Sequence, residues 1–307
     1  MTQPPAFRPA DLAGILVVVV IWGLNFVVMK VGLAYFTPFQ LGAGRFAFAF
    51  LPLALRIRVP RVRGRWLLAF GLAQGVGQFG LLFVALQVGM TASLASVLMQ
   101  TQVFFTAVFG VLLLGERIAG PLRAGFAFAA AGLACFAINT GAVHGAAGAS
   151  AWGLVLTLGS AAMWAASNIV VRKAQQESGG FDALAFVVWS SAVAIVPFFA
   201  LSWYFDPPGA QANWRHAPWQ GWVALAVLGW LATSLAYGLW TGLLKRFAAS
   251  RVAPFSLGVP VIGLVAGIAL LGEVVSALQW AGALLVFCAL ACVLFGDRVW
   301  RRRTARA

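Results

Sequence analysis

The sequence consists almost entirely of long apolar runs, interrupted at intervals by charged residues, glycine or proline. A helix needs about 20 mostly apolar residues to cross the hydrocarbon core of a bilayer. A soluble domain averages about 25% charged residues, whereas this chain has 9% charged and 62% hydrophobic residues. The runs are continuous and do not alternate in polarity as the strands of an outer-membrane barrel would. They therefore predict an all-α polytopic membrane protein.

The breaks between the runs predict ten transmembrane helices. We expect them at 11–31, 38–56, 66–88, 92–114, 120–140, 151–172, 181–203, 219–244, 251–271 and 277–296. No small-residue cleavage site follows the first run, so we expect it to be a retained helix and not a removed signal peptide.

The basic residues indicate the orientation of these helices. If the chain has ten spans, nearly all of the 21 Lys and Arg residues fall at the two termini or in every second loop. The exceptions are Lys30, Arg45 and Arg215. Positively charged loops stay on the cytoplasmic side, so both termini are expected inside the cell. Such loops suit a multi-pass protein of a bacterial inner membrane. The net charge of +14 does not indicate a nucleic-acid partner, because no basic stripe is interleaved with stacking aromatic residues.

The chain also contains a weak internal repeat. Shifting the sequence by about 157 residues aligns Gly115 and Glu116 with Gly272 and Glu273, and 25-NFVVMK-30 resembles 168-NIVVRK-173 at a smaller shift. We expect a first five-helix repeat at 1–142, a second at 143–300 and a basic cytoplasmic tail at 301–307. Because five is odd, the second repeat enters the membrane from the opposite face, as in many secondary transporters.

The repeated Gly-Glu pairs are interpreted as structural joints between helices. Inverted repeats would put Glu116 near the inner surface and Glu273 near the outer surface, too far apart to act as one acid–base pair. Each glutamate precedes a helix, and a carboxylate is favoured near the positive N-terminal end of a helix dipole.

Three of these features together resemble the EamA-type drug/metabolite transporter superfamily. They are the two five-helix halves, the Trp and Asn of helices one and six (Trp22, Asn25, Trp164 and Asn168), and the Gly-Glu pairs that end helices four and nine. The resemblance covers nearly the whole chain and is strongest to bacterial amino-acid exporters, including an aromatic amino-acid exporter. It implies a ten-helix basket around a central cavity, with helices five and ten set apart from the substrate path, and it implies export as the direction of transport.

Polar and aromatic residues inside the spans are the candidates for a substrate cavity, because polar groups in a membrane tend to face the bundle or a wet cavity. Several lie at helical spacing on one face of their span. The predicted cavity residues are Trp22, Asn25, Gln78, Gln100, Trp164, Asn168, Tyr237 and Ser256. The alternative is that such groups only join helices through interhelical hydrogen bonds.

Prolines and small residues suggest two further roles. Pro254 and Pro260 remove two backbone donors from helix nine, and a kink there would open the helix toward a substrate or act as a gate. Gly125, Ala129 and Gly132 place small residues on one face of helix five. This pattern predicts close helix packing, either within the bundle or between the subunits of a homodimer.

The scarcity of charge inside the spans limits the function. No Asp or Glu lies in the middle third of any expected span, so neither an intramembrane enzyme nor a buried proton relay is indicated. The histidines, His144 and His216, fall in loops and the three cysteines lack ligand spacing, so we expect no metal or cofactor. Lys30 and Arg45 are interpreted as snorkelling toward the outer surface.

We therefore expect an exporter of neutral, hydrophobic or aromatic amino acids, or similar small metabolites, that works by alternating access through a central cavity. Two alternatives stay open. A multidrug exporter of cations would need a buried acid, and a non-transporting receptor or scaffold would carry a polar effector segment. The coupling ion is open, and uniport is compatible with these residues.

Overall fold

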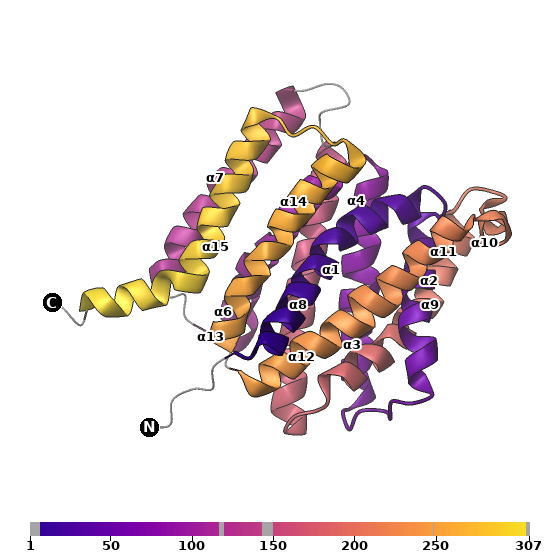
Figure 1. Cartoon of the computed structure of the whole chain (residues 1–307), viewed down its shortest axis with the longest axis horizontal. Coiled ribbons are helices and arrows are strands. Elements are labelled where there is room, and N and C mark those ends of the chain that lie inside the picture. Colours follow the sequence, from indigo (N-terminus) through magenta and orange to yellow (C-terminus); the bar gives the residue numbers. More distant parts are fainter. Residues whose placement is uncertain (1–6, 117–119, 143–149, 248, 305–307) are drawn as a thin grey trace.

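The structure of the protein is a computed structural model, and it describes residues 7–116, 120–142, 150–247 and 249–304. Within these ranges the chain is helical and contains no strand. The helices form one bundle in which segments distant in sequence lie side by side (Figure 1). His144 and the expected boundary at residue 143 lie outside the described ranges.

The helices have the following order and bounds. They are α1 (Pro9–Leu33), α2 (Pro38–Ala54), α3 (Gly64–Phe70), η1 (Gly71–Phe79), α4 (Gly80–Gln87), α5 (Ala92–Leu98), η2 (Met99–Thr101), α6 (Gln102–Leu114), α7 (Gly120–Ala142), α8 (Ala151–Ser178), α9 (Ala183–Phe205), η3 (Ala210–Ala212), α10 (Asn213–His216), α11 (Trp219–Ala226), η4 (Val227–Leu235), α12 (Ala236–Arg246), α13 (Ala249–Val252), η5 (Ala253–Leu257), α14 (Gly258–Leu271) and α15 (Ala277–Thr304).

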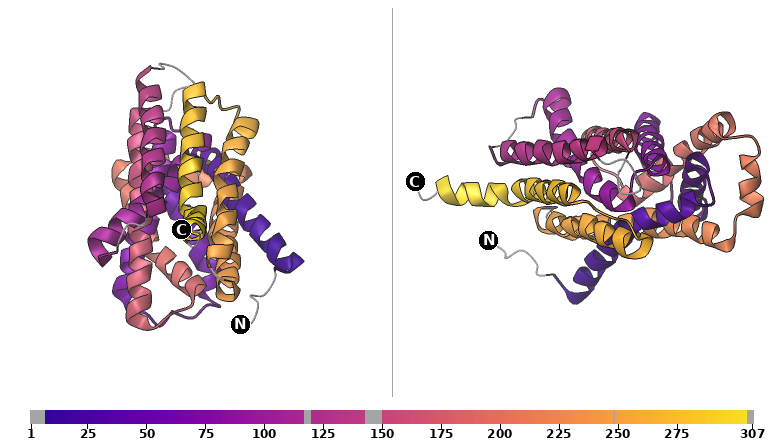
Figure 2. Two further views of the ribbon diagram at one scale, coloured as in Figure 1. Left: turned by 90° about the vertical axis from the view of Figure 1, so that its left-hand side faces the viewer. Right: turned by 90° about the horizontal axis from the view of Figure 1, so that it is seen from above.

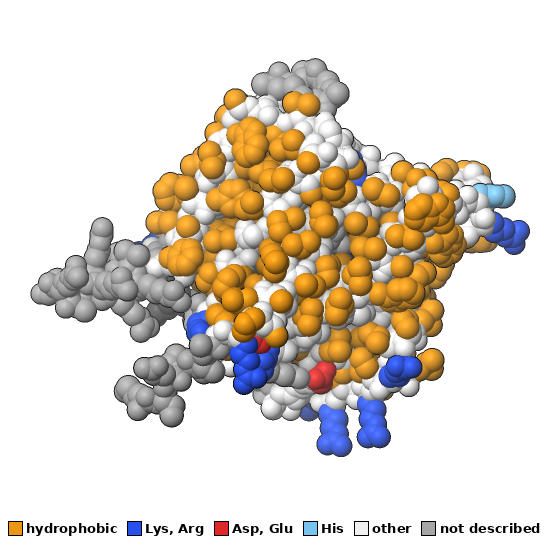
Figure 3. Space-filling view, viewed as in Figure 1, with side chains coloured by type: hydrophobic (Ala, Val, Ile, Leu, Met, Phe, Trp, Pro, Cys, Tyr) orange, Lys and Arg blue, Asp and Glu red, His pale blue; other side chains and the backbone are white. Residues whose placement is uncertain are grey.

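The described residues contain nine helical stretches that are long and apolar enough to cross a membrane. α2 has only 17 residues. At 1.5 Å per residue it is about 26 Å long, at the short limit for a hydrocarbon core of about 30 Å. Hydrophobic side chains cover most of the face seen in Figure 3, and Lys and Arg gather at its lower edge and right-hand tip. The chain is a multi-pass membrane protein, and the count of ten helices stays a prediction.

Two of the expected spans contain a π-helix. The span expected at 66–88 consists of α3, the π-helix η1 and α4, and the span expected at 219–244 consists of α11, the π-helix η4 and α12. A Cβ atom on Gly71 of η1 would lie 2.6 Å from the Ser190 carbonyl oxygen, and one on Gly229 of η4 would lie 2.8 Å from the Arg45 carbonyl oxygen. These glycines let η1 approach α9 closely and η4 approach α2. π-Helices are rare and occur mostly near functional sites.

Both Gly-Glu pairs end a helix in the same way. Gly115 follows α6 with a φ of 68°, and Gly272 follows α14 with a φ of 66°, in the left-handed region that favours glycine. The N–H of each glutamate donates to the carbonyl group of the glycine six residues earlier, at 3.2 Å for Glu116 and 3.3 Å for Glu273. The two segments therefore share the same local structure.

α7 and α15 pack mainly on each other at one side of the bundle (Figures 1 and 2), and they join its core through contacts such as that of Phe126 with Phe104 of α6. A Cβ atom on Gly132 would lie 2.9 Å from the Gly282 carbonyl oxygen, and one on Gly125 would lie 3.2 Å from the Ala289 carbonyl oxygen. Ala129 is buried in the same face. The close packing expected at these positions thus occurs within the chain, against α15, and a homodimer stays a prediction. α15 continues to Thr304, into the segment expected as a tail.

Candidate functional site

A central cavity of about 310 Å³ lies between the two halves of the chain. This volume is within the range of pockets that bind small molecules. The residues that line it are Trp22, Asn25, Phe26, Met29, Arg45, Gln78, Phe79, Leu82, Met99, Gln100, Gln102, Trp164, Asn168, Ala232, Tyr237, Trp240, Ser256 and Val259. All eight residues predicted for the cavity are among them. Their role in binding stays a prediction.

Aromatic rings form one wall of the cavity. The ring centroids of Trp22 and Tyr237 are 5.3 Å apart with an edge-to-face arrangement, and those of Trp22 and Trp240 are 5.4 Å apart. Nε1 of Trp22 donates to the carbonyl oxygen of Ala232 at 3.0 Å. This bond satisfies the indole N–H and joins α1 to η4, so the Trp22 ring is held in place as an apolar contact surface.

Side-chain amides form the polar part of the wall. Nδ2 of Asn168 donates to Oε1 of Gln102 at 3.0 Å and to the Thr106 hydroxyl at 3.2 Å, which joins α8 to α6. Asn25 and Gln78 are also buried, but Asn25 Oδ1 and Gln78 Oε1 have no hydrogen-bond partner in the structure. Because buried polar groups are nearly always paired, these two oxygens stand out as unsatisfied acceptors among the residues that line the cavity.

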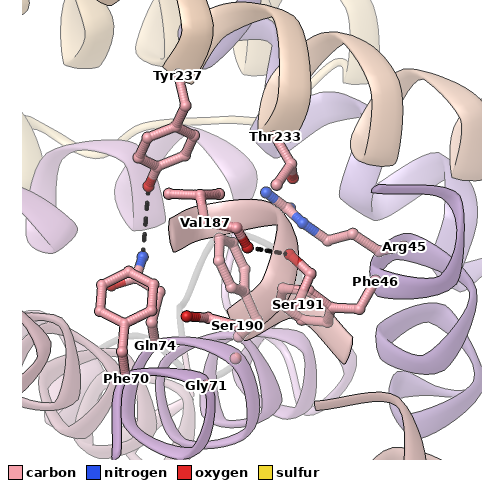
Figure 4. A pocket seen from close by; sticks show the side chains of 12 residues that line it. Arg45, Phe46, Phe70, Gly71, Gln74, Val187, Ser190, Ser191, Thr233 and Tyr237 are labelled. Atoms are coloured by element: carbon pink, nitrogen blue, oxygen red, sulfur yellow. Dashed lines mark hydrogen bonds between the residues drawn. The ribbon is translucent and has the colours of Figure 1, made fainter. Parts of the chain in front are cut away.

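A second, smaller chamber of about 20 Å³ adjoins the central cavity, sharing Arg45, Phe79 and Tyr237 with it (Figure 4). Nε2 of Gln74 donates to the Tyr237 hydroxyl at 3.4 Å, and the Ser167 hydroxyl donates to Gln74 Oε1. Gln74 thus connects η1 with α8 and α12. Its side chain therefore joins helices through hydrogen bonds. This is the alternative role considered above for polar residues inside the spans.

The structure overturns the snorkelling interpretation of Arg45, whereas that of Lys30 stays a prediction. Arg45 lies near the middle of α2, and only 1% of its surface is exposed, so its guanidinium cannot reach solvent. It enters both chambers from α2 (Figure 4). Nζ of Lys30 instead donates to the Leu86 carbonyl oxygen at 2.7 Å, at the end of α4. Sequence reasoning missed Arg45, although an ionisable residue in mid-span is itself a signal of function.

The proline segment of helix nine changes helix type instead of simply kinking. Pro254 lies at the start of the 3₁₀-helix η5, and Pro260 lies in the first turn of α14. The Pro260 carbonyl oxygen accepts a hydrogen bond from the Ser96 hydroxyl at 3.3 Å. The hydroxyl of Ser256, between the two prolines, donates to the Ala253 carbonyl oxygen at 2.7 Å. The segment borders the cavity through Ser256, and a gating role for the two prolines stays a prediction.

The carboxylate of Glu273 does not serve the helix that follows it, and that expectation is wrong. It accepts hydrogen bonds from the backbone N–H groups of Ala92 at 2.7 Å and Ser93 at 2.8 Å, at the start of α5 in the other half of the chain. Ser276 caps the following helix, α15, instead. The Glu116 carboxylate contacts Arg172 of α8 at 3.1 Å. The carboxylate of Glu273 therefore accepts hydrogen bonds from the first N–H groups of a helix, but that helix is α5, which lies far from Glu273 in the sequence.

The sequence matches a known family model in both halves. The model of the EamA-like transporter family matches residues 10–138 and again residues 151–295. The chain belongs to the EamA-like transporter family. Membership of this family points to a transporter of small molecules rather than an enzyme.

Several relatives are similar over most of the length of this EamA-family chain. A probable amino-acid metabolite efflux pump of Salmonella typhimurium is 40% identical, and the aligned region covers 95% of this chain and 96% of that protein. A protein of the same description in Escherichia coli is 38% identical, covering 94% and 95%. A probable terminal-alkyne amino-acid exporter of Streptantibioticus cattleyicolor is 26% identical and covers 87% of both chains.

One solved crystal structure shares the fold. It is 16% identical in sequence, has a TM-score of 0.61 and covers 96% of this chain and 99% of its own. At this identity the likeness concerns the arrangement of helices alone.

Proposed function

We propose that this protein exports neutral, hydrophobic or aromatic amino acids, or similar small metabolites, by alternating access through the central cavity. The observation that carries the proposal is the lining of that cavity: aromatic rings, apolar side chains, neutral amides and Arg45, with no Asp or Glu among the lining residues that the structure describes. Relatives similar over nearly the whole chain are described as amino-acid metabolite efflux pumps, which supports both the substrate class and the direction.

The same lining argues against an exporter of drug cations. A permanent cation inside the membrane would need a carboxylate to offset its desolvation. Within the described ranges, the only ionisable groups that line the cavity are Arg45 and the Tyr237 phenol. A positively charged drug would meet an arginine there, so a zwitterion with an apolar side chain is the better fit.

We infer that the chain has ten transmembrane helices in two inverted repeats with both termini inside the cell. The π-helices η1 and η4, and the left-handed glycines Gly115 and Gly272, recur at corresponding positions in the two halves. The family model also matches twice along the chain. The uneven distribution of arginine supports an inner-membrane location with the arginine-rich end facing the cytoplasm.

This arrangement suggests which end of the cavity is closed. α5 packs on α14 at the place where Glu273 binds the start of α5. This contact closes the end of the cavity that lies opposite the arginine-rich loops. At the arginine-rich end α6 packs on α8, but in the described residues it makes no comparable contact with α12, α13 or η5. We infer a conformation open toward the cytoplasm. In the inverse conformation Glu116 would take the role that Glu273 has here.

Counterflow in proteoliposomes tests the proposal without assuming a coupling ion. Vesicles containing the purified protein are loaded with unlabelled phenylalanine, methionine or threonine and diluted into a trace of the labelled amino acid. We expect transient accumulation of label for phenylalanine and methionine above protein-free vesicles. Absence of accumulation for all three would overturn the amino-acid assignment. Accumulation of a quaternary ammonium dye instead would favour the drug-cation alternative.

A further inference from the structure

Among the residues that the structure describes, Arg45 is the one cation that lines the central cavity, and the helices around it hold it in place. It is among the largest fully buried side chains of the described residues. A Cβ atom on Gly229 would lie 2.8 Å from the Arg45 carbonyl oxygen, so η4 packs directly on the backbone of α2 at this position. The guanidinium projects from this fixed point toward Thr233 and Ser191 (Figure 4). The packing of η4 on α2 therefore fixes the backbone position from which the Arg45 side chain extends.

The guanidinium has an aromatic partner but lacks an acidic one. Its Cζ atom lies 3.7 Å from the centroid of the Phe79 ring, a cation–π contact that covers the face of the group. The N–H donors lie in the plane of the guanidinium, and Nε and Nη1 have no hydrogen-bond partner in the structure. A buried charge is costly unless it is paired, and these donors lack such a pairing in this conformation.

The acidic side chains near the other basic groups are engaged elsewhere. Asp11 pairs with Arg246, Glu116 with Arg172, and Glu177 with Arg63 and Arg65. Asp206 accepts from Thr37 and Ser202, and Glu273 binds the start of α5. None of these carboxylates lines the cavity.

Two unpaired acceptors complement the two unpaired donors. Asn25 Oδ1 and Gln78 Oε1 line the same cavity, are buried and lack partners. An α-amino acid carries a carboxylate that needs donors and an ammonium group that needs acceptors. The unsatisfied groups of the cavity are the complement of such a zwitterion.

We propose that the Arg45 guanidinium binds the carboxylate of the transported solute, while the side-chain carbonyls of Asn25 and Gln78 accept hydrogen bonds from its ammonium group. A planar guanidinium suits a carboxylate, because two N–H groups can donate to its two oxygens. The aromatic wall then contacts the side chain of the solute. A single cation fits a single carboxylate better than a nucleotide or sugar phosphate, which would need several basic groups. This proposal rests on the proposed function for the identity of the solute.

The test compares solutes that differ only in the charged groups. In the counterflow assay, unlabelled phenylalanine, 3-phenylpropionate, phenylalaninamide and phenethylamine compete against labelled phenylalanine. With the wild-type protein we expect phenylalanine to compete best, and removal of its carboxylate to raise the half-inhibitory concentration at least tenfold. Phenylalaninamide competing as well as phenylalanine would overturn the role of Arg45, and this arm needs no variant.

A second arm uses the variant Arg45→Met, with Arg215→Met as the matched control because Arg215 is exposed on α10, away from the cavity. The readout is thermal stabilisation of the purified protein by 3-phenylpropionate and by 3-phenylpropionamide. We expect the carboxylate to stabilise the wild type and Arg215→Met, and to have no advantage over the amide in Arg45→Met. Equal or absent stabilisation of the wild type by the two compounds would refute the proposal. Because this arm measures binding, it decides the role of Arg45 even if phenylalanine is not transported and the proposed function fails.

Discussion

The carboxylate of Glu273 accepts a hydrogen bond from the backbone N–H of Ser93 at 2.8 Å, across 180 residues of sequence. This contact joins the end of α14 in the second half of the chain to the start of α5 in the first. Glu116, at the corresponding place in the first half, contacts Arg172 instead, and both of those side chains are about half exposed. The two halves therefore have the same local structure at their Gly-Glu pairs but different long-range contacts.

Replacing Glu273 with alanine should destabilise the protein more than replacing Glu116. The first change removes the acceptor for two helix-terminal N–H groups, which costs roughly 0.5–2 kcal/mol for a typical N-cap. The second removes an exposed ion pair, which contributes about 0–1 kcal/mol. The apparent melting temperatures of the two purified variants, measured at one scan rate, provide the comparison. Equal losses would show that the contact with α5 contributes little.

Gly267→Ala should slow transport. A Cβ atom there would lie 2.8 Å from the backbone nitrogen of Ser93 and close to its hydroxyl, so α14 and α5 could not close as they do here. Overpacking of this kind costs about 1–3 kcal/mol, enough to lower the counterflow rate roughly tenfold if closure is required. Gly14→Ala is the control, since its Cβ would meet no other atom within 4 Å. A Gly267→Ala protein with the wild-type rate would mean that this contact does not form during transport.

Trp164→Ala should impair binding of the solute without affecting insertion into the membrane. Trp164 lines the cavity, whereas Trp152, on the same helix α8, is 72% exposed and can serve as the matched control. Loss of an aromatic contact surface should raise the half-saturating concentration of phenylalanine about tenfold, by analogy with aromatic contacts at interfaces. Gln78→Ala should behave like Trp164→Ala. If both cavity variants transport like Trp152→Ala, the assignment of the cavity is wrong.

Gly132→Ala should lower stability while leaving transport intact. Its Cβ would lie 2.9 Å from the Gly282 carbonyl oxygen, so α7 and α15 would have to move apart. We expect a loss of about 1–3 kcal/mol from overpacking. The counterflow rate per folded protein should stay within about twofold of wild type, because no described residue of either helix lines the cavity. Gly14→Ala, whose Cβ would meet no other atom within 4 Å, is the control. A parallel loss of transport would place α7 and α15 on the substrate path.

Much of the cavity could be predicted because its chemistry is local. A large polar or aromatic side chain inside an apolar run is conspicuous, and its helical phase relates it to its neighbours on the same helix. Trp22, Asn25, Trp164 and Asn168 could be selected in this way. Arg45 was misinterpreted for a related reason. Its distance along the helix from the membrane surface suggested snorkelling, but whether it faces lipid, solvent or a cavity depends on α9 and η4, which pack on α2.

The sequence by itself determined the class of the protein, the approximate positions of its helices and the repeated Gly-Glu pairs, because apolar length and glycine conformation are properties of short segments. Only the tertiary structure decided that η1 and η4 are π-helices, that Glu273 binds the start of α5, and that Arg45 is buried in the cavity with unpaired donors. These features depend on which backbone groups and side chains meet across the bundle. Such meetings are set by the packing of helices far apart in the chain, so no single segment of the sequence encodes them.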